Sequence, residues 1–485
     1  MKHPLRGGTA LAALFLAGLT APVLSGPAAA APSGLPGDFN GDGYRDVAVA
    51  APAATVNGRS WAGRVAVVYG TASGLNPAKH QLISQNSAGI PGSAEKDDEF
   101  GRSLAVADLN RDGYSDLVVG APREKAGSAE DAGTVVIVWG SRSGLSGGTT
   151  VKNPQTLYGS YFGLGIAAGD FTGDGKPDLA ISAQGDSGTS SWRIRLIRGP
   201  FTKSGTTGRV SSSTPGIDQP QLTAGRVGGD TRADLVVTGR KPNGHPLATA
   251  VYYKGTPDGI AKAASLRTAT TAAIGDLNKD GYGDIVLGNP LDADRDPSGS
   301  TGGRIHIVYG TSSGPSATRR VSLTQDTAGV PDSAEAGDDF GEALAIGDFD
   351  RDGYGDLAVG APGESFGDDA HYLGSAGAIT LLRGSASGVT TTRAVHLTQD
   401  SPGVPGAAEG GDGFGQALLA SDVGRDGRAD LTAVAYGEND PEGAVWHLPG
   451  AAATLYSTTA SATFGPTKVG LPARTYTDFG SGLAG

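Results

Sequence analysis

The sequence predicts an all-β fold, a seven-bladed β-propeller whose ring is closed by the C-terminal strand. An acidic nonapeptide, first seen as DFNGDGYRD at residues 38–46, recurs along the chain, and an apolar run that ends in glycine follows each copy. Both markers count seven units. Each unit can form a sheet of at most four strands, which cannot bury both of its faces alone. Packing seven such sheets around an axis buries these faces, so a propeller is the expected architecture.

Residues 1–31 are predicted to be a secretory signal peptide in front of the propeller at 32–485. Lys2 and Arg6 precede an apolar run, and small residues follow it up to an expected cleavage site near Ala31. The apolar run is short for a membrane span, and the sequence holds no second one. We therefore expect a secreted, extracellular protein without a membrane span.

The composition favours a turn-rich globular protein. The chain has 80 glycines, yet 18% of its residues are charged and 38% are apolar. A net charge of −12 argues against nucleic acid as a partner and is compatible with the uptake of metal cations. The chain contains no cysteine, so something other than disulfides must hold these loops together. We expect a monomer.

The nonapeptides define the seven units in order. Clear copies start at Asp38, Asp108, Asp170, Asp276 and Asp348, and a reduced copy starts at Asp422. A degenerate copy, RVGGDTRAD from residue 226, keeps Asp230 and Asp234. The units close with glycine at Gly70, Gly140, Gly199, Gly255, Gly310, Gly384 and Gly450.

Short apolar runs between turn residues predict the strands of each unit. DLVVGAP and GTVVIVWG are typical, because both are rich in Val and Ile and are bounded by glycine, proline or aspartate. A Phe-Gly pair opens the strand before most nonapeptides, at Phe100, Phe162, Phe340 and Phe414. The first unit lacks this pair, whereas Phe479 and Gly480 stand near the end of the chain with no nonapeptide after them. We therefore predict that this last segment supplies the first strand of the first blade and removes an open sheet edge.

Each nonapeptide predicts a calcium site. Side chains at positions 1, 3, 5 and 9 and the backbone carbonyl at position 7 can converge, and glycine at position 6 allows the turn. Ligand sets made only of oxygen suit Ca²⁺, which would cancel the repulsion between the carboxylates. The predicted ligands are Asp38, Asn40, Asp42, Tyr44 and Asp46; Asp108, Asn110, Asp112, Tyr114 and Asp116; Asp170, Thr172, Asp174, Lys176 and Asp178; Asp276, Asn278, Asp280, Tyr282 and Asp284; Asp348, Asp350, Asp352, Tyr354 and Asp356; and Asp422, Asp426 and Asp430.

Two other interpretations of the nonapeptides are weighed against calcium. The helical calcium loop needs glutamate at position 12, where this chain has only apolar residues. These residues are Val49, Val119, Ile181, Leu287 and Val359. A solvated surface turn would explain one copy, but five copies in register argue against it.

The seven sites are not expected to be equivalent. Thr172 replaces the position-3 carboxylate or amide, Gly424 removes that ligand in the seventh unit, and Arg226 with Gly228 destroys the fourth site. We expect four to six calcium ions in a structural role. A site contributes about 1.4 kcal/mol to stability when calcium is about tenfold above its Kd.

The Phe-Gly pairs, the nonapeptides and the Gly-Ala-Pro segments at 120–122 and 360–362 resemble FG-GAP repeats, as in the N-terminal propeller of integrin α subunits. The resemblance covers about residues 36–485. It implies a seven-bladed propeller with calcium loops between the first and second strands of the blades. The third, fifth and seventh units depart from it, with SAQ, GNP and VAY in place of Gly-Ala-Pro, and the fourth and fifth lack Phe-Gly.

The resemblance implies an extracellular binding or adhesion module whose ligand is a protein or a glycan. The long loops before the Phe-Gly strands, such as 324–339, would gather on one face and bind it. The alternative is a polysaccharide-binding lectin, or a polysaccharide-active enzyme, with an acidic or aromatic cleft at the axis.

No catalytic residues are predicted. GTSSG at 310–314 matches a nucleophile-elbow pattern around Ser312, but it occupies the same repeat phase as GTASG at 70–74 and is interpreted as a turn. The seven histidines show no metal-binding spacing. Trp139 and Trp446 lie at repeat-end strands and are expected to pack between blades, whereas Trp61 and Trp192 lie nearer loops.

Overall fold

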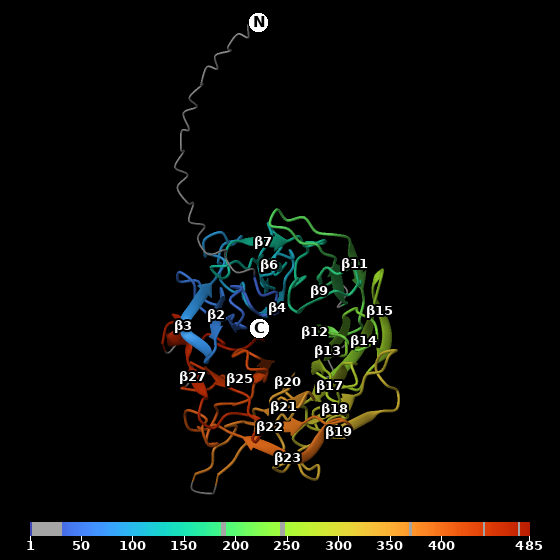
Figure 1. The fold of residues 1–485 in the computed structure, drawn as a ribbon, viewed down its shortest axis with the longest axis vertical. Helices are drawn as coiled ribbons and strands as arrows, with labels where there is room; N and C mark the ends of the chain where they lie inside the picture. Colours follow the sequence, from blue (N-terminus) through green and yellow to red (C-terminus); the bar gives the residue numbers. More distant parts are fainter. Residues whose placement is uncertain (2–31, 186–190, 243–247, 368–370, 440–441, 474–475) are drawn as a thin grey trace. The chain divides into compact units, whose positions relative to one another are not determined.

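Apolar runs in each of the seven units pair into an antiparallel sheet of four strands, and the seven sheets surround a central axis (Figure 1). The computed structural model describes residues 1, 32–185, 191–242, 248–367, 371–439, 442–473 and 476–485. The predicted signal peptide lies outside these residues, apart from Met1. Residues 32–485 form one unit of the structure. The predicted seven-bladed propeller is confirmed.

The strands follow the order of the repeats. The first blade contains β28 (Leu483–Ala484), β1 (Val47–Ala51), β2 (Arg64–Thr71) and β3 (Gly74–Ile83). The second contains β4 (Ser103–Ala107), β5 (Asp116–Ala121), β6 (Thr134–Val138) and β7 (Gly148–Val151). The third contains β8 (Ile166–Gly169), β9 (Asp178–Gln184), β10 (Trp192–Ile197) and β11 (Val210–Ser213). The fourth contains β12 (Asp218–Gly225), β13 (Asp234–Arg240), β14 (Ala248–Thr256) and β15 (Gly259–Ser265).

The remaining three blades repeat this order. The fifth contains β16 (Thr271–Gly275), β17 (Asp284–Asn289), β18 (Arg304–Val308) and β19 (Arg320–Leu323). The sixth contains β20 (Ala343–Gly347), β21 (Asp356–Ala361), β22 (Ala378–Arg383) and β23 (Thr390–Leu397). The seventh contains β24 (Ala417–Ser421), β25 (Asp430–Ala435), β26 (Ala444–Leu448) and β27 (Ala462–Phe464), followed by the short 3₁₀ helix η1 (Pro466–Val469).

The C-terminal segment closes the ring as predicted. β28 pairs antiparallel with β1, with Ala484 opposite Ala48 and Leu483 opposite Val49. The N–H of Gly480 also donates to the carbonyl of Ala50 at 2.8 Å. The first blade is therefore a sheet of four strands built from both ends of the propeller, and β1 has no free edge.

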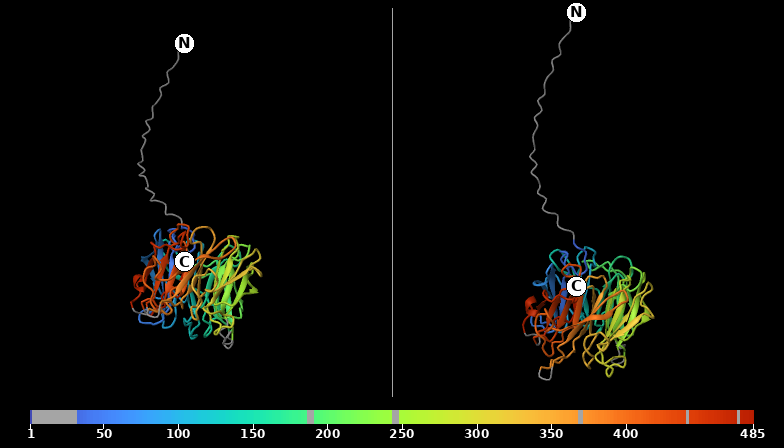
Figure 2. Two further views of the ribbon diagram at one scale, coloured as in Figure 1. Left: turned by 90° about the horizontal axis from the view of Figure 1, so that it is seen from below. Right: turned by 60° about the horizontal axis from the view of Figure 1, so that its bottom comes forward.

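Each blade buries its two faces against its two neighbours. The core consists of seven main apolar clusters, and each joins one blade to the next, including the seventh to the first. The second strands β1, β5, β9, β17, β21 and β25 therefore consist of buried residues almost throughout. The first strands contact one another around the whole ring, from β28 through β4 to β24 and back to β28. Figure 2 shows the ring from two further directions.

Close backbone contacts between blades explain the Phe-Gly and Gly-Ala-Pro motifs. Phe100 is fully buried, and Gly101 has φ +100° and donates its N–H to the carbonyl of Gly120 at 2.9 Å. A Cβ on Gly120 would lie 2.3 Å from the carbonyl oxygen of Gly163 in the third blade. The glycines of the two motifs therefore allow neighbouring blades to approach closely.

The loops fall on two faces of the ring, because neighbouring strands within a blade are antiparallel. We call the face that carries the first-to-second strand connections, residues 38–46 and their six counterparts, the nonapeptide face. The opposite face carries the second-to-third connections and the connections between blades. Within the described residues, no helix is long and apolar enough to cross a membrane.

Candidate metal centre

The aspartate at position 9 of the nonapeptide makes the same two hydrogen bonds in all seven blades. One carboxylate oxygen accepts the backbone N–H of position 2, at 2.9 to 3.1 Å. The other oxygen accepts the N–H of the glycine that closes the apolar run of the third strand, at 2.8 to 3.1 Å. The seven aspartates are Asp46, Asp116, Asp178, Asp234, Asp284, Asp356 and Asp430. This aspartate therefore fastens the loop to the neighbouring strand of its own blade.

The aspartate at position 1 orders the inner turn of the loop. Asp108 accepts the N–H of Asp112 at 3.0 Å with one oxygen and the N–H of Gly113 at 2.9 Å with the other. The same pair of bonds recurs in the other five nonapeptides that begin with aspartate. At position 5, Asp112 accepts the N–H of Tyr114 at 3.2 Å. The loop backbone thus folds around its carboxylates and holds them on one side.

The sixth blade gathers the densest group of predicted ligands. Oxygen atoms of Asp348, Asp350 and Asp356 lie within 4.8 Å of one another. The guanidinium of Arg383, which is almost fully buried, forms an ion pair with Asp350. A cation bound here would therefore share Asp350 with the guanidinium of Arg383.

The residues at position 3 differ between blades. Asn110 accepts the N–H of Asp112 at 2.9 Å with its side-chain oxygen, as Asn40 and Asn278 do in their loops. Thr172, which is buried, offers a hydroxyl oxygen at this position. These amide, hydroxyl and carboxylate oxygens suit a hard cation such as Ca²⁺.

Burial raises the pKa of the position-9 carboxyl groups in the first and second blades. The pKa of Asp46 rises to about 8 and that of Asp116 to about 7, because both groups are removed from water, while their two backbone N–H bonds act in the opposite direction. The carboxylates at positions 1 and 5 also raise both values. A divalent cation between these groups would stabilise their charged forms.

The structure places the predicted ligand side chains together in the loops, but their role as calcium ligands stays a prediction. The fourth loop keeps only Asp230 and Asp234, and Asp230 pairs with Arg232 at 3.0 Å. The fourth blade nevertheless forms a full sheet. The sequence did not lead us to predict that the position-9 aspartate fastens the loop to the closing glycine of its blade. The retention of Asp234 in the degenerate copy, together with the seven closing glycines, was a signal for this contact.

The other sequence candidates are structural in the described residues. Ser312 lies in a tight turn that Thr311 and Gly314 close with two backbone hydrogen bonds. Trp139 and Trp446 are buried, as expected, and Trp192 is also buried and stacks on Tyr161. His3 and His245 lie outside the described residues. The groups of potential metal ligands that the described residues form contain carboxylates alone.

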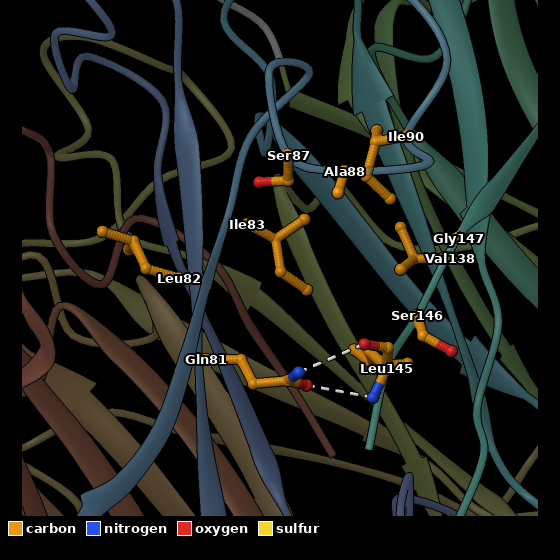
Figure 3. A pocket seen from close by; sticks show the side chains of 10 residues that line it. All are labelled: Gln81, Leu82, Ile83, Ser87, Ala88, Ile90, Val138, Leu145, Ser146 and Gly147. Carbon is orange, nitrogen blue, oxygen red and sulfur yellow. Dashed lines mark hydrogen bonds between the residues drawn. The ribbon is translucent and has the colours of Figure 1, made fainter. Parts of the chain in front are cut away.

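A cavity of about 190 Å³ lies between the first and second blades (Figure 3). Ile83, Ile90 and Val138 line it, and Gln81 exchanges two hydrogen bonds with the backbone of Leu145, at 2.9 and 3.2 Å. None of its lining residues is titratable. Its polar side chains are those of Gln81, Ser87 and Ser146.

Five of the seven units match a known repeat. The FG-GAP repeat matches residues 30–68, 100–138, 162–192, 268–308 and 340–382. Five of the seven units of the propeller are therefore FG-GAP repeats. The fourth and seventh units, whose nonapeptides are degenerate or reduced, are not matched.

Relatives of these FG-GAP repeats occur in longer proteins. The chain is 38% identical over 151 residues to phosphatidylinositol-glycan-specific phospholipase D of Mus musculus, a match that covers 30% of this chain and 17% of that protein. It is 40% identical over 108 residues to integrin alpha-6 of Homo sapiens, covering 22% and 9%. It is 25% identical over 312 residues to integrin alpha-PS2 of Drosophila melanogaster, covering 64% and 18%. The matches thus span less than a fifth of these relatives.

Two solved structures resemble this chain weakly. A fucose-specific lectin from Aleuria aurantia has a TM-score of 0.34 at 11% identity, covering 76% of this chain and 96% of the lectin. AofleA from Arthrobotrys oligospora has a TM-score of 0.38 at 10% identity, covering 75% and 88%. These likenesses carry no argument about function.

Proposed function

We propose that this FG-GAP propeller is a secreted, calcium-stabilised binding module that recognises an extracellular protein or glycan. The observation that carries the calcium role is the recurrence of one loop geometry. Six nonapeptides hold the carboxylates of positions 1 and 5 with the same backbone hydrogen bonds, all on the nonapeptide face. Oxygen-lined loops of this kind suit Ca²⁺.

A pair of exposed aromatic residues on the opposite face supports a binding role. Trp61, in the second-to-third strand connection of the first blade, is 37% exposed, and Tyr476 is 59% exposed. Their ring centroids lie 5.8 Å apart. Exposed aromatic rings offer a large contact area to a protein or to the apolar face of a sugar. We therefore place the ligand surface around these two rings.

The calcium role is tested in the sixth blade. Asp348→Ala combined with Asp352→Ala should lower the free energy of unfolding by about 1.4 kcal/mol more in millimolar calcium than in chelator, the contribution of a site with calcium tenfold above Kd. The loss that remains in chelator is that of the backbone hydrogen bonds that Asp348 and Asp352 accept. Asp230→Ala in the degenerate fourth loop is the matched control, and it should change the free energy of unfolding by the same amount in both media. Thermal melts of the three proteins give the comparison, and an equal loss in chelator would contradict structural calcium at this loop.

A second candidate, a polysaccharide-binding lectin or polysaccharide-active enzyme, is favoured by the same aromatic pair. A glycan-binding screen run together with lyase and hydrolase assays separates the candidates. Binding that Trp61→Ala abolishes without any polymer turnover supports a lectin, whereas turnover would overturn the non-enzymatic proposal. Neither candidate function is based on the activity of the phospholipase D among the relatives, because the match covers 17% of that protein.

A further inference from the structure

Three equivalent acidic clusters lie on the face opposite the nonapeptides, at the junctions of blades one and two, five and six, and six and seven. Each contains a glutamine that follows the fourth strand of one blade, an aspartate before the next Phe-Gly pair, and a glutamate after the second strand of that next blade. In each cluster the glutamine and the glutamate are 39 residues apart. The members are Gln85, Asp98 and Glu124; Gln325, Asp338 and Glu364; and Gln399, Asp412 and Glu438.

The clusters share their hydrogen bonds. The glutamine Nε2 donates to the glutamate Oε2 at 2.5 to 2.6 Å in all three. The aspartate Oδ2 accepts the backbone N–H of the glutamate three residues before it, at 2.5 to 2.8 Å. This repetition shows that the aspartate and the glutamate after the second strand occupy the same place in each cluster, whereas Asp332 and Glu335 are exposed.

Each glutamine carries an unsatisfied acceptor at the cluster. Gln85, Gln325 and Gln399 are 2%, 2% and 1% exposed, so their amide groups are out of reach of bulk water. Their Nε2 atoms hold the amide against the glutamate, yet among the described residues no donor reaches their Oε1 atoms. A buried acceptor without a protein partner is costly, and it calls for a water, a proton or a cation as its partner.

The junction of the fifth and sixth blades has the most complete ligand set. Oxygen atoms of Asp332, Glu335 and Glu364 lie within 4.8 Å of one another, and Asp338 is buried beside them. Within the described residues, no lysine or arginine forms an ion pair with these four groups, and His396 Nδ1 lies 3.5 Å from Asp332. Several carboxylates thus converge beside the amide of Gln325, and the basic side chain that the described residues place against them is His396, whose pKa burial lowers.

We propose that this cluster is a divalent-cation site of the calcium type, separate from the nonapeptide sites. Its ligands are Asp332, Glu335, Glu364 and the Oε1 atom of Gln325. The other two clusters are weaker counterparts, because Gly92 and Gly406 stand where Asp332 stands. Hard carboxylate and amide oxygens are the ligands that Ca²⁺ prefers. The proposal does not depend on calcium at the nonapeptides.

Protonation is the competing explanation. Burial raises the pKa of Glu364 to about 8 and that of Asp338 to about 7, and neighbouring carboxylates contribute to both shifts. A shared proton would satisfy one oxygen of the group, whereas a divalent ion would contact several oxygens at once. The two explanations differ in the number of bound ions, which can be counted.

Terbium provides the first test, because Tb³⁺ replaces Ca²⁺ and scatters anomalously. Crystals of the whole chain soaked in Tb³⁺ should show an anomalous peak between Glu335 and Glu364. Peaks at the nonapeptides without one in this cluster would overturn the proposal. A peak in this cluster with none at the nonapeptides would support it and count against the calcium role proposed above, so the two can fail separately. The absence of peaks at both places would overturn both.

Ion counting provides the second test. Native mass spectrometry in calcium should show one ion fewer for Glu364→Gln than for the parent chain. The matched control is Glu342→Gln, which removes a carboxyl group whose pKa burial also raises to about 7 but which lies outside the cluster, and it should keep the full count. An unchanged count for Glu364→Gln would overturn the proposal. If that variant does not fold, the terbium map of the parent chain decides.

Discussion

The aspartate at position 9 of the nonapeptide has a structural role that does not depend on a bound metal. Both oxygens of Asp234 are bonded to backbone N–H groups, of Val227 at 3.1 Å and of Gly255 at 2.9 Å, in a loop that has lost most of its ligand residues. A carboxylate that accepts two buried N–H groups is hard to replace, because the amide of asparagine offers one acceptor oxygen. This explains why the aspartate persists in the degenerate fourth unit.

We therefore expect Asp234→Asn to lower the free energy of unfolding by about 1 to 3 kcal/mol, the cost of leaving a buried N–H unsatisfied. The loss should be the same in calcium and in chelator, since this loop lacks the other ligands. Urea unfolding in both media measures it. A loss that appears only in calcium would show that Asp234 acts as a ligand instead.

His306 makes the stability depend on pH. It lies in β18, is buried, and its Nδ1 is 2.6 Å from Ser322 Oγ. Burial, with smaller contributions from Arg267 and Arg304, lowers its pKa to about 4. The unfolded chain takes up this proton near pH 6.5, so the stabilising contribution is full above pH 6.5 and is lost as the pH falls toward 4.

His306→Gln should remove this dependence. Between pH 7 and pH 5 the parent should lose about 2 kcal/mol more unfolding free energy than the variant, because only the parent has the histidine to titrate. Comparing the two proteins cancels the titration of the many carboxyl groups they share. Parallel slopes for parent and variant would contradict a neutral, buried His306.

At the scale of the element, the blades are held at a distance that only glycine allows. Gly360 in β21 shows this most clearly, because a Cβ there would lie 2.0 Å from the carbonyl oxygen of Gly415 in the seventh blade. The N–H of Gly415 in turn donates to Val434 at 3.0 Å, so the backbone there is already held in place. The Phe-Gly and Gly-Ala-Pro motifs are thus two sides of one contact between blades.

Gly360→Ala should cost at least about 1 to 3 kcal/mol, the usual range for overpacking a core, because the methyl group meets a fixed backbone atom. Gly410→Ala is the control: Gly410 is exposed, does not have a positive φ, and its nearest neighbouring atom would lie 3.6 Å from the new Cβ. Thermal melts of the two variants should differ clearly. Similar melting temperatures would mean that the blades can separate to admit a side chain.

At the scale of the whole molecule, stability depends on joining the two ends of the propeller. Phe479 is buried in the cluster between the seventh and first blades and packs edge-on against Phe464, with ring centroids 6.3 Å apart. β28 then covers the edge of β1. An open ring would expose both an apolar face and a row of unpaired backbone groups.

Removal of residues 479–485 should therefore destabilise the chain by more than Phe479→Ala, for which about 3 to 5 kcal/mol is expected. The truncated chain should also self-associate through the free edge of β1. Melting curves and light scattering of the two proteins measure these effects. A truncated monomer as stable as Phe479→Ala would show that the pairing of β28 contributes nothing.

Sequence alone is sufficient for the number of blades, the closing strand and the position of the nonapeptides between the first and second strands. These features depend on short-range signals that repeat in register: glycine and aspartate at turns, apolar runs in strands, and a Phe-Gly pair without a following loop. Repetition makes each signal visible even where one copy, such as that at Asp234, is degenerate.

Only the tertiary structure brings Gln325 to Glu364, Trp61 to Tyr476 and Arg383 to Asp350. These pairs join residues far apart in the chain, and two of them cross the boundary between blades. A local pattern reports backbone conformation and burial, but it does not report which loops meet. The packing of one blade on the next decides those contacts, and with them the acidic clusters and the aromatic pair on the face opposite the nonapeptides.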